Sequence, residues 1–295
     1  MKHLILADIH ANRAALRAIL DTPEARDCGS VVTLGDQINY GPCPAQCMAL
    51  LRRFCAEGGR TLSLLRGNHE DRLPRLAELT GANWGLLRWS ADRLSEAGED
   101  MGGLPVDLLL ADGRVRCTHG TPGDPWHLVD ADGARAELDR LAETEPACVL
   151  LLSGHNHIRW RVRSGPREAV NPGSAGMWED ERGRRAPFAV LTEDGGRLAV
   201  SLHEAPYAGE DLLRDYAQSG CRRAGPTIAR LSLTVMRTGS RHLMMHYLAH
   251  ARRVAEAMGG AIGDPAVWRA ADAAWPWADG LTTEAFWTEL EARYA

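Results

Sequence analysis

Residue types that bind metals recur in five short clusters along the chain. In two of them a ligand type is followed two residues later by a histidine, as in Asp8 with His10 and His155 with His157. The clusters offer carboxylate, imidazole and amide groups and no thiolate, a mixture that suits Mn²⁺, Fe²⁺, Zn²⁺ or Co²⁺. The candidate metal ligands are Asp8, His10, Asp36, Asn68, His119, His155 and His157.

The spacing of these residues predicts a site for two ions. Asp-x-His and His-x-His would place alternate side chains on one side of an extended loop, so that both could turn to one ion. The adjacent Gly35 and Gly67 would allow tight backbone turns. Asp36 lies between the other clusters in the sequence and is the natural bridging carboxylate. Two ions about 3.5–4 Å apart can clamp a phosphate and activate a water or hydroxide.

His69 adjoins the candidate ligand Asn68 but is expected to act differently. An imidazole at this position could donate a proton to the leaving oxygen or hydrogen-bond the developing charge. His69 is therefore the candidate catalytic residue, while no substrate-binding residue is assigned. The expected reaction is hydrolysis of a phosphodiester, phosphomonoester or nucleotide by a metal-activated hydroxide.

The clusters follow predicted strands at the points where those strands end. The first part of the chain alternates strands and helices and the later part is rich in strands, which favours a layered α/β sandwich. Open α/β sheets bind ligands beyond the carboxyl ends of their strands, so distant clusters would meet at one edge. The predicted strands are 2–7, 31–34, 61–65, 106–110, 114–118 and 148–152, then an antiparallel series at 159–163, 168–170, 187–191 and 198–202. The predicted helices are 12–20, 44–56, 70–78, 83–97 and 131–142.

Residues 206–295 differ in character from residues 1–205. They show helical runs near 240–258, 264–275 and 282–293 and no strong strand signal. We expect a helical C-terminal extension that acts as a lid or a dimerisation surface, appended to a catalytic domain of residues 1–205. Its four tryptophans are expected to pack in a core rather than stack on bases. They are Trp268, Trp275, Trp277 and Trp287.

The order of the clusters resembles that of the calcineurin-like metallophosphoesterase superfamily. That order is DxH, GD, GNHE, H and GHxH, and the chain contains Asp8-Ile9-His10, Gly35-Asp36, Gly67-Asn68-His69-Glu70, His119 and Gly154-His155-Asn156-His157. The stretches Asp8–Asn12, Tyr40–Pro42 and Asn171–Ser174 resemble its small bacterial and archaeal phosphodiesterase branch. Residues 206–295 contain no motif of the family.

The resemblance implies a four-layer α/β/β/α sandwich and two divalent metal ions. Mn²⁺ is expected first, with Fe²⁺, Zn²⁺, Co²⁺ or Ni²⁺ as alternatives. His69 would match the family's proton-donating or oxyanion-contacting histidine. One ion would be held by Asp8, His10, Asp36 and His157, and the other by Asp36, Asn68, His119 and His155.

Two departures from the superfamily's pattern bear on the substrate. Its protein phosphatases carry GDxVDRG, whose aspartate supports the catalytic histidine and whose arginine grips phosphate. Asn39 replaces that aspartate and Tyr40 that arginine, which counts against a phosphoprotein phosphatase. Symmetric dinucleoside tetraphosphate hydrolases share the arginine, so this activity is also disfavoured, although some small relatives could cleave such nucleotides.

Composition and charge exclude several other classes. The net charge of −5 provides no overall basic field, so a nucleic-acid partner is not expected. The N-terminus turns polar at Asp8, too early for a signal peptide, and no apolar stretch is long enough for a membrane span. A cytoplasmic protein is expected, with homo-oligomerisation left open. The seven cysteines, Cys43, Cys47 and Cys55 among them, are expected to be buried and unpaired.

Taken singly, each candidate has an ordinary structural explanation. Asp8 and Asp36 could cap helices, Asn68 could be a turn residue, and His119 could be a structural histidine. These explanations leave the fixed order of the ligand types after strand ends unexplained. Other residues are expected to be structural or exposed, namely Arg13, Arg66, Arg159, His242, His246, His250 and the turn Asn171–Ser174. A nuclease and a non-catalytic metal-binding scaffold are the competing functions.

Overall fold

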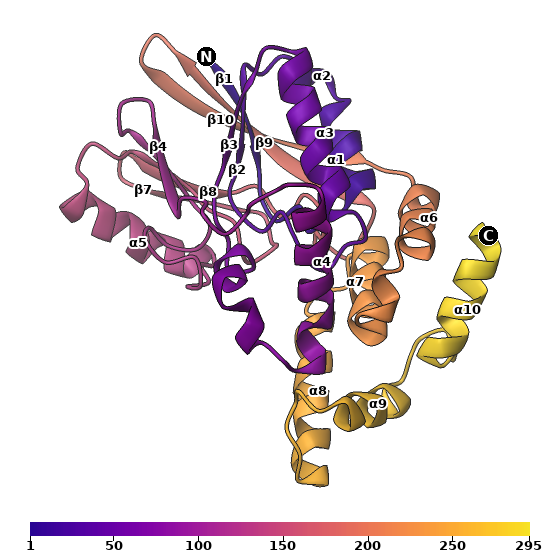
Figure 1. The fold of residues 1–295 in the computed structure, drawn as a ribbon. Coiled ribbons are helices and arrows are strands. Elements are labelled where there is room, and N and C mark those ends of the chain that lie inside the picture. The colour runs from indigo at the N-terminus through magenta and orange to yellow at the C-terminus, as the bar shows by residue number, and fades with distance from the viewer.

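Two five-stranded sheets form the centre of the computed structural model, which describes residues 1–295 (Figure 1). The first sheet has the order β10-β9-β1-β2-β3, with β1, β2 and β3 parallel and β9 antiparallel to β1. Its strands are β1 (Lys2–Leu6), β2 (Ser30–Thr33), β3 (Thr61–Leu64), β9 (Arg185–Asp194) and β10 (Arg197–Pro206). The second sheet has the order β4-β5-β6-β8-β7, in which β5, β6 and β8 are parallel. Its strands are β4 (Asp107–Leu110), β5 (Val115–Thr118), β6 (Leu150–Leu152), β7 (Trp160–Ser164) and β8 (Arg167–Asn171).

An apolar layer joins the two sheets face to face. Successive side chains of a strand point to opposite faces. In and after β1, Ile5 and Ala7 therefore enter the layer between the sheets, while Leu4 and Leu6 join the core on the other side. Val115 and Leu150 of the second sheet meet them across the layer. This packing fixes the distance between the edges where the metal-binding residue types emerge.

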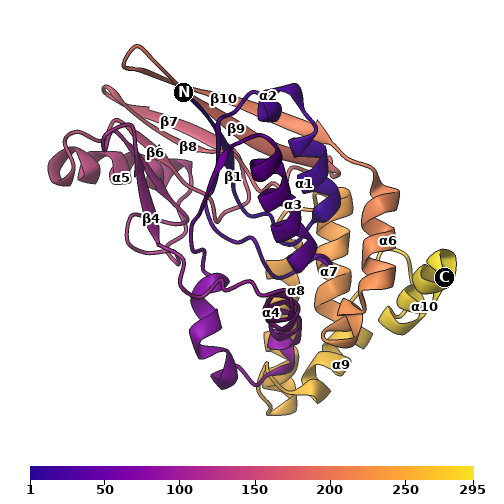
Figure 2. The same cartoon turned by 45° about the horizontal axis from the view of Figure 1, so that its top comes forward.

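Helices cover the outer face of each sheet (Figure 2). α1 (Arg13–Leu20) and α3 (Pro44–Glu57) lie on the first sheet, and α5 (Ala131–Thr144) lies on the second. Asn12 caps α1 as predicted, because its side chain accepts a hydrogen bond from the backbone N–H of Ala15. A short helix, α2 (Pro23–Arg26), precedes β2. The predicted α/β/β/α sandwich is confirmed.

The predicted helix at 70–78 is instead a 3₁₀ segment, η1 (Glu70–Glu78), with a kink at Arg75. Pro74 lies inside the segment and lacks the N–H needed to continue an α-helix, which accounts for the kink. It is followed by η2 (Ala82–Trp84) and α4 (Gly85–Glu96), which match the helical prediction for 83–97 closely. The kinked segment follows directly after His69.

The strands after β6 do not form one antiparallel series, which corrects the sequence prediction. β7 and β8 pair with each other in the second sheet, and β8 also runs parallel to β6. β9 and β10 form a separate antiparallel pair on the first sheet. Each hairpin is a local feature, whereas the sheet that a hairpin joins depends on which open edge it meets in the folded chain.

No strand occurs after β10, as predicted for the C-terminal extension. α8 (Leu243–Met258), α9 (Pro265–Ala274) and α10 (Thr283–Tyr294) confirm the three predicted runs. The sequence prediction missed α6 (Gly209–Ser219), η3 (Cys221–Arg223) and α7 (Pro226–Thr238). No helix is both long and apolar enough to cross a lipid bilayer.

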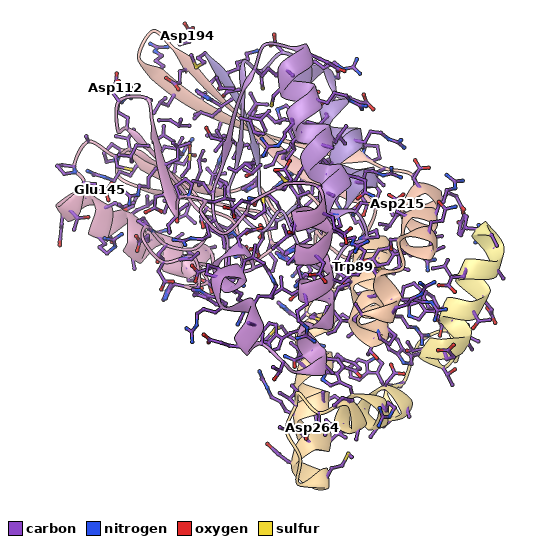
Figure 3. The ribbon with its side chains drawn as sticks, viewed as in Figure 1. Trp89, Asp112, Glu145, Asp194, Asp215 and Asp264 are labelled. Carbon is purple, nitrogen blue, oxygen red and sulfur yellow. The ribbon has the colours of Figure 1, made fainter.

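The C-terminal helices share one apolar core with α1, α3 and α4. Tyr216 and Trp287 are fully buried in the same cluster as Leu16 and Leu51. Asp215 of α6, labelled in Figure 3, forms an ion pair with Arg13 of α1. Removing the extension would expose this core, so point substitutions test its role better than truncation. The four tryptophans lie in this core or pack against it, as expected.

The cysteines and the α8 histidines have structural places. All seven cysteines are unpaired and buried, as predicted. His246 is exposed, and His250 lies close to the backbone carbonyl of Ala271, 3.0 Å from Nε2. His242 precedes α8 with a left-handed backbone, φ 58°. These three histidines do not converge on one point.

Candidate metal centre

All five clusters emerge where strands of the two sheets end. β1, β2 and β3 of the first sheet lead into the clusters of Asp8, Asp36 and Asn68, while β5 and β6 of the second lead into those of His119 and His155. Backbone hydrogen bonds tie neighbouring loops, from Asp8 N–H to the Gly35 carbonyl (3.1 Å) and from Gly154 N–H to the His119 carbonyl (2.8 Å). The predicted convergence of the clusters is thereby confirmed.

Most of the candidate ligands have a left-handed backbone rather than the extended one that the sequence suggested. The residues with positive φ are Asp8 (53°), His10 (45°), Asp36 (54°), His155 (72°) and His157 (58°). This region is costly for residues other than glycine and persists where surrounding structure enforces it, often at functional sites. Each positive φ turns the chain sharply, so side chains two residues apart face the same point without lying on an extended strand.

Asp36 lies between two groups of ligands. Its Oδ2 is 3.3 Å from His119 Nε2 and 3.8 Å from His10 Nε2. Three sets of side chains have ligand atoms within 4.8 Å of one another, and Asp36 belongs to two of them. The sets are Asp8, His10 and His157; His10, Asp36 and His69; and Asp36, His119 and His155. This geometry suits a carboxylate that bridges two cations.

The backbone orients three of the four candidate histidines. His10 Nδ1 lies 3.1 Å from the Ile38 carbonyl, and His119 Nδ1 lies 2.8 Å from the Leu34 carbonyl. His155 Nε2 lies 3.2 Å from the Trp126 carbonyl. A carbonyl can only accept, so each of these nitrogens carries the proton and the other nitrogen of a neutral ring is left with a lone pair. The lone pairs face the centre of the site.

In the neutral forms of these rings, which are the forms that bind metals, the lone pairs approach other electron-rich atoms. His10 Nε2 lies 3.0 Å from His157 Nε2, and His119 Nε2 lies 3.0 Å from Asn68 Oδ1. Such contacts are repulsive between neutral groups and become favourable when a cation lies among them. The donor set of nitrogen and oxygen atoms therefore fits divalent metal ions of the borderline or hard class.

The protonation states of Asp36 and His155 depend on burial and on the neighbouring histidines. Burial alone would raise the pKa of Asp36, but the neighbouring histidines, His119 above all, hold it well below its ordinary value. The Asp36 carboxylate in turn outweighs the effect of burial on His119 and raises the pKa of that ring to about 9, so a metal ion would displace a proton from it. Burial lowers the pKa of His155 to about 4. Asp36 is therefore a carboxylate and His155 a neutral imidazole near pH 7, which are the forms that bind metals.

His69 lies beside this cluster with its own set of contacts. Its Nε2 is 3.8 Å from Asp36 Oδ2, and its backbone N–H donates to Asp36 Oδ1 at 3.0 Å. Burial lowers the pKa of the His69 imidazole to about 4. Asn39 Nδ2 lies 3.0 Å from His69 Nδ1, so the Asn39 amide donates and the imidazole proton resides on Nε2. Nε2–H faces the site, where it can donate to a leaving oxygen.

Glu70 holds the loops of the first sheet in place. It is fully buried and accepts hydrogen bonds from the backbone N–H groups of Gly67, Asp36, Gln37 and Ile38. The glycine at position 67 is required by the close approach of these loops, because a Cβ there would lie 2.1 Å from Asp36 Oδ1. Asp36 is thus positioned by a neighbouring loop as well as by its own.

The turn Asn171–Ser174 supports the site from behind, as expected. Asn171 Nδ2 donates to the Gly154 carbonyl at 2.6 Å, and Ser174 Oγ donates to the Asp8 carbonyl at 2.7 Å. The turn therefore fixes the loops that carry Asp8 and His155.

Glu179 is a supporting residue that the sequence analysis missed, since no recognised motif surrounds it. Its Oε1 lies 3.5 Å from His157 Nδ1, which favours a proton on Nδ1 and leaves Nε2 free. Its Oε2 accepts from the backbone N–H of His242 at 2.5 Å, at the start of α8. Glu179 therefore connects the C-terminal helices to a candidate ligand.

We expect Glu179→Gln to weaken Mn²⁺ binding by about 10–100-fold, because carboxylates that orient a ligand histidine typically contribute this much. Calorimetric titration of the metal-free protein with Mn²⁺ measures the change. Glu181→Gln, at an exposed position nearby, is the matched control. Equal affinities for Mn²⁺ in all three proteins would show that Glu179 does not position His157.

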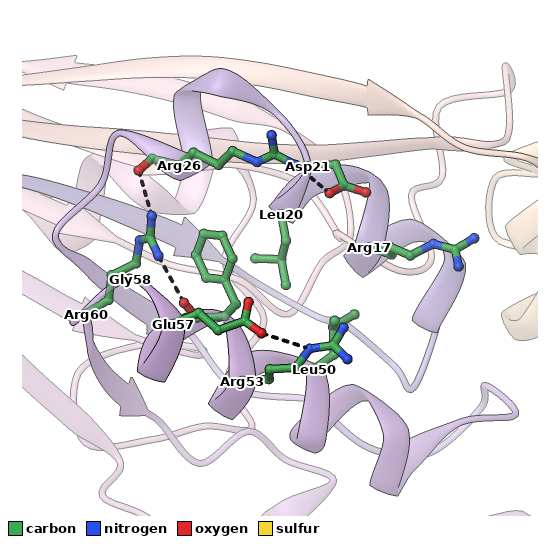
Figure 4. Close-up of a pocket in the computed structure, with 10 residues that line it drawn as sticks. Arg17, Leu20, Asp21, Arg26, Leu50, Arg53, Glu57, Gly58 and Arg60 are labelled. Atoms are coloured by element: carbon green, nitrogen blue, oxygen red, sulfur yellow. Dashed lines mark hydrogen bonds and ion pairs between the residues drawn. The ribbon is translucent and has the colours of Figure 1, made fainter.

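A surface pocket between α1, α2 and α3 is separate from this centre (Figure 4). Its arginines already have partners, as Arg26 pairs with Asp21 and Arg53 with Glu57. None of the seven candidate ligands lines it. Its side chains form a paired ionic surface rather than an extension of the metal centre.

The two-sheet fold and the convergence of metal-ligand types define an α/β/β/α sandwich with a candidate dinuclear metal centre. The family model of the calcineurin-like phosphoesterase superfamily domain matches residues 1–196, and the chain belongs to this superfamily.

One curated protein and two solved structures are similar to this chain. Over 80 residues the chain is 44% identical to a symmetrical bis(5'-nucleosyl)-tetraphosphatase of Paracidovorax citrulli (strain AAC00-1). This match covers 26% of each protein, so the chain spans about a quarter of that relative's length. The fold is similar to that of a metallophosphoesterase from Sphaerobacter thermophilus, with 23% identity, a TM-score of 0.58, and coverage of 80% of this chain and 99% of the other. It is also similar to that of a hypothetical protein from Pyrococcus horikoshii OT3, with 17% identity, a TM-score of 0.65, and coverage of 81% and 99%.

Proposed function

We propose that the chain hydrolyses a phosphodiester or nucleotide at a pair of divalent ions. One ion would be bound by Asp8, His10, Asp36 and His157, and the other by Asp36, Asn68, His119 and His155. The observation that carries this proposal is the convergence of ligand nitrogen and oxygen atoms, from side chains oriented by the backbone, around the Asp36 carboxylate. Mn²⁺ is the proposed metal, because nitrogen and oxygen donors without thiolate suit it.

The chain's own residues account for positioning and for stabilising the leaving oxygen. When bound, the two ions would neutralise phosphate charge and lower the pKa of a water molecule. His69 presents Nε2–H to the site, where it donates a hydrogen bond to the leaving oxygen and stabilises its developing charge. Asn39 selects this tautomer, and the backbone carbonyls of Leu34 and Ile38 select those of His119 and His10. The ligands are thus oriented before any substrate binds.

A nucleotide substrate is supported by the similarity to the tetraphosphatase, whose match covers a quarter of that protein. Asn39 and Tyr40 depart from the aspartate and arginine that the superfamily's protein phosphatases carry, so a phosphoprotein is disfavoured. The extension 206–295, as a unit distinct from a catalytic domain of residues 1–205, stays a prediction. So do the cytoplasmic location and a homo-oligomeric state.

The test is metal removal followed by reconstitution. Protein stripped with a chelator and reloaded with Mn²⁺ is assayed on an aryl phosphodiester, a phosphomonoester, cyclic nucleotides and dinucleoside tetraphosphates. We expect turnover with Mn²⁺ and a loss of at least about 10³-fold in the stripped protein, since the ions supply several kcal/mol of barrier lowering. Adding Mn²⁺ back should restore the rate.

Two other results would point to the competing functions. Two bound Mn²⁺ per chain without turnover of any substrate would indicate a metal-binding scaffold. Cleavage of single-stranded DNA or RNA well above that of nucleotide esters would indicate a nuclease. Turnover that survives complete metal removal would contradict the proposal itself.

A further inference from the structure

Arg72 is a half-buried cation held between two tryptophans. Its guanidinium carbon lies 4.3 Å from the ring centroid of Trp84 and 4.2 Å from that of Trp126. No carboxylate lies within ion-pair distance, and its side chain makes no hydrogen bond to the protein, although the adjacent Asp71 pairs with Arg66. Stacking occupies both faces of the planar guanidinium and leaves its N–H groups free along the edge.

This cation is attached to the elements that carry the metal centre. Arg72 lies one turn after His69, and its backbone N–H donates to the His69 carbonyl at 3.3 Å. The carbonyl of Trp126 lies 3.2 Å from His155 Nε2. The stack of Trp126 on Arg72 is further fixed because the Trp126 indole N–H donates to Asp71 at 2.8 Å. Arg72 is therefore held rigidly at the rim of the site by both sheets' loops.

The field of Arg72 reaches the centre. Arg72 follows His69 by one turn, so its positive charge lies close to the centre. Tyr40, whose ring centroid lies 4.9 Å from those of His10 and His69, brings no positive charge of its own. On the side of the centre formed by Tyr40 and His69, Arg72 is therefore the cationic side chain that a substrate phosphate would meet.

The other arginines near the clusters already have partners. Arg13 pairs with Asp215, and Arg159 donates to the carbonyls of Pro172 and His203. Arg66 lies 3.5 Å from Asp71. Free N–H groups on a rigid, partly desolvated guanidinium are what a phosphate oxygen binds well, because charge-assisted bonds strengthen when water is excluded. Of these four arginines, Arg72 alone has neither an ion pair nor a side-chain hydrogen bond within the protein.

We propose that Arg72 binds a phosphate oxygen of the substrate, and that Trp84 and Trp126 hold its guanidinium for this purpose. The inference deepens the proposed function and rests on it. The ligand class is a phosphate group of an ester or nucleotide, recognised by charge and by paired N–H groups. Arg72 is thus the substrate-binding residue that completes the site.

The experiment compares Arg72→Met and Arg72→Lys with the wild-type protein, all loaded with Mn²⁺. Arg75→Met on the same 3₁₀ segment, where Arg75 is exposed and pairs with Glu78, is the matched control. We expect kcat/KM for an aryl phosphodiester to fall about 10²-fold in Arg72→Met, with the inhibition constant of inorganic phosphate rising by at least about tenfold. Mn²⁺ content should be unchanged, and Arg72→Lys should recover part of both losses.

Inorganic phosphate also separates this inference from the proposed function. Its binding to the Mn²⁺-loaded protein, measured by calorimetry, tests Arg72 even if no ester is turned over. Weaker phosphate binding in Arg72→Met with intact metal, and recovery of turnover by added methylguanidine, would support the assignment. Unchanged phosphate affinity, or a loss that accompanies loss of Mn²⁺ in both Arg72 variants, would overturn it.

Discussion

Replacing Asp36 with asparagine is expected to abolish paired-metal binding and to lower kcat/KM by at least about 10³-fold, equivalent to about 4 kcal/mol of barrier. The carboxylate accepts the His69 backbone N–H through Oδ1 and directs Oδ2 at His119 and His10. An asparagine can keep the first contact with its oxygen, but its NH₂ group then replaces Oδ2. That group has no lone pair to offer a cation.

The measurement is bound Mn²⁺ per chain by elemental analysis, together with turnover of an aryl phosphodiester. Asp112→Asn is the matched control, since Asp112 is exposed in the turn between β4 and β5 and also has a positive φ, 55° (Figure 3). Both proteins should have the same circular dichroism spectrum. Two tightly bound ions in Asp36→Asn would show that this carboxylate does not bridge them.

Replacing His69 with alanine is expected to lower kcat by about 10²–10³-fold while both ions remain bound, because a positioned hydrogen-bond donor to a developing charge typically contributes this much. The imidazole is neutral near pH 7, and its Nε2–H faces the site. The loss should depend on the leaving group. A nitrophenolate is a stable anion that needs less help from a donor, so its ester should lose less than an alkyl ester or a nucleoside ester.

Comparing two leaving groups separates stabilisation of the leaving oxygen from structural damage. His246→Ala, at an exposed position on α8, should leave all rates unchanged. If His69→Ala slows nitrophenyl and alkyl esters equally, or releases Mn²⁺, then His69 does not stabilise the leaving oxygen. Elemental analysis on the same samples gives the metal content.

Local sequence patterns predicted most of the elements well. The strand at 2–7 and the helix at 12–20 were found within one residue of their ends, because alternation and helical periodicity are strong there. The sequence prediction missed the helices α6 and α7. Both pack into the core that the C-terminal helices share with α1, α3 and α4. The hairpins after β6 were recognised as antiparallel, but their division between two sheets was not, since pairing edges are chosen by contacts distant in the sequence.

By itself the sequence determined which chemistry was available to this protein. The sequence alone contains the ligand types, their order and their positions after strand ends. These features predicted the clusters that the structure brings together. The departures Asn39 and Tyr40 were also visible there. The functional groups of a short motif are set by its residue types and do not depend on the rest of the fold.

Only the tertiary structure decided how those groups act together. It set five candidate ligands in left-handed conformations, oriented the histidines by carbonyls from other loops, and turned Asn39 into a donor toward His69. It also brought Glu179 behind His157 and Arg72 between two tryptophans. None of these contacts has a local signature, because the partners are distant in the sequence and meet only in the folded chain.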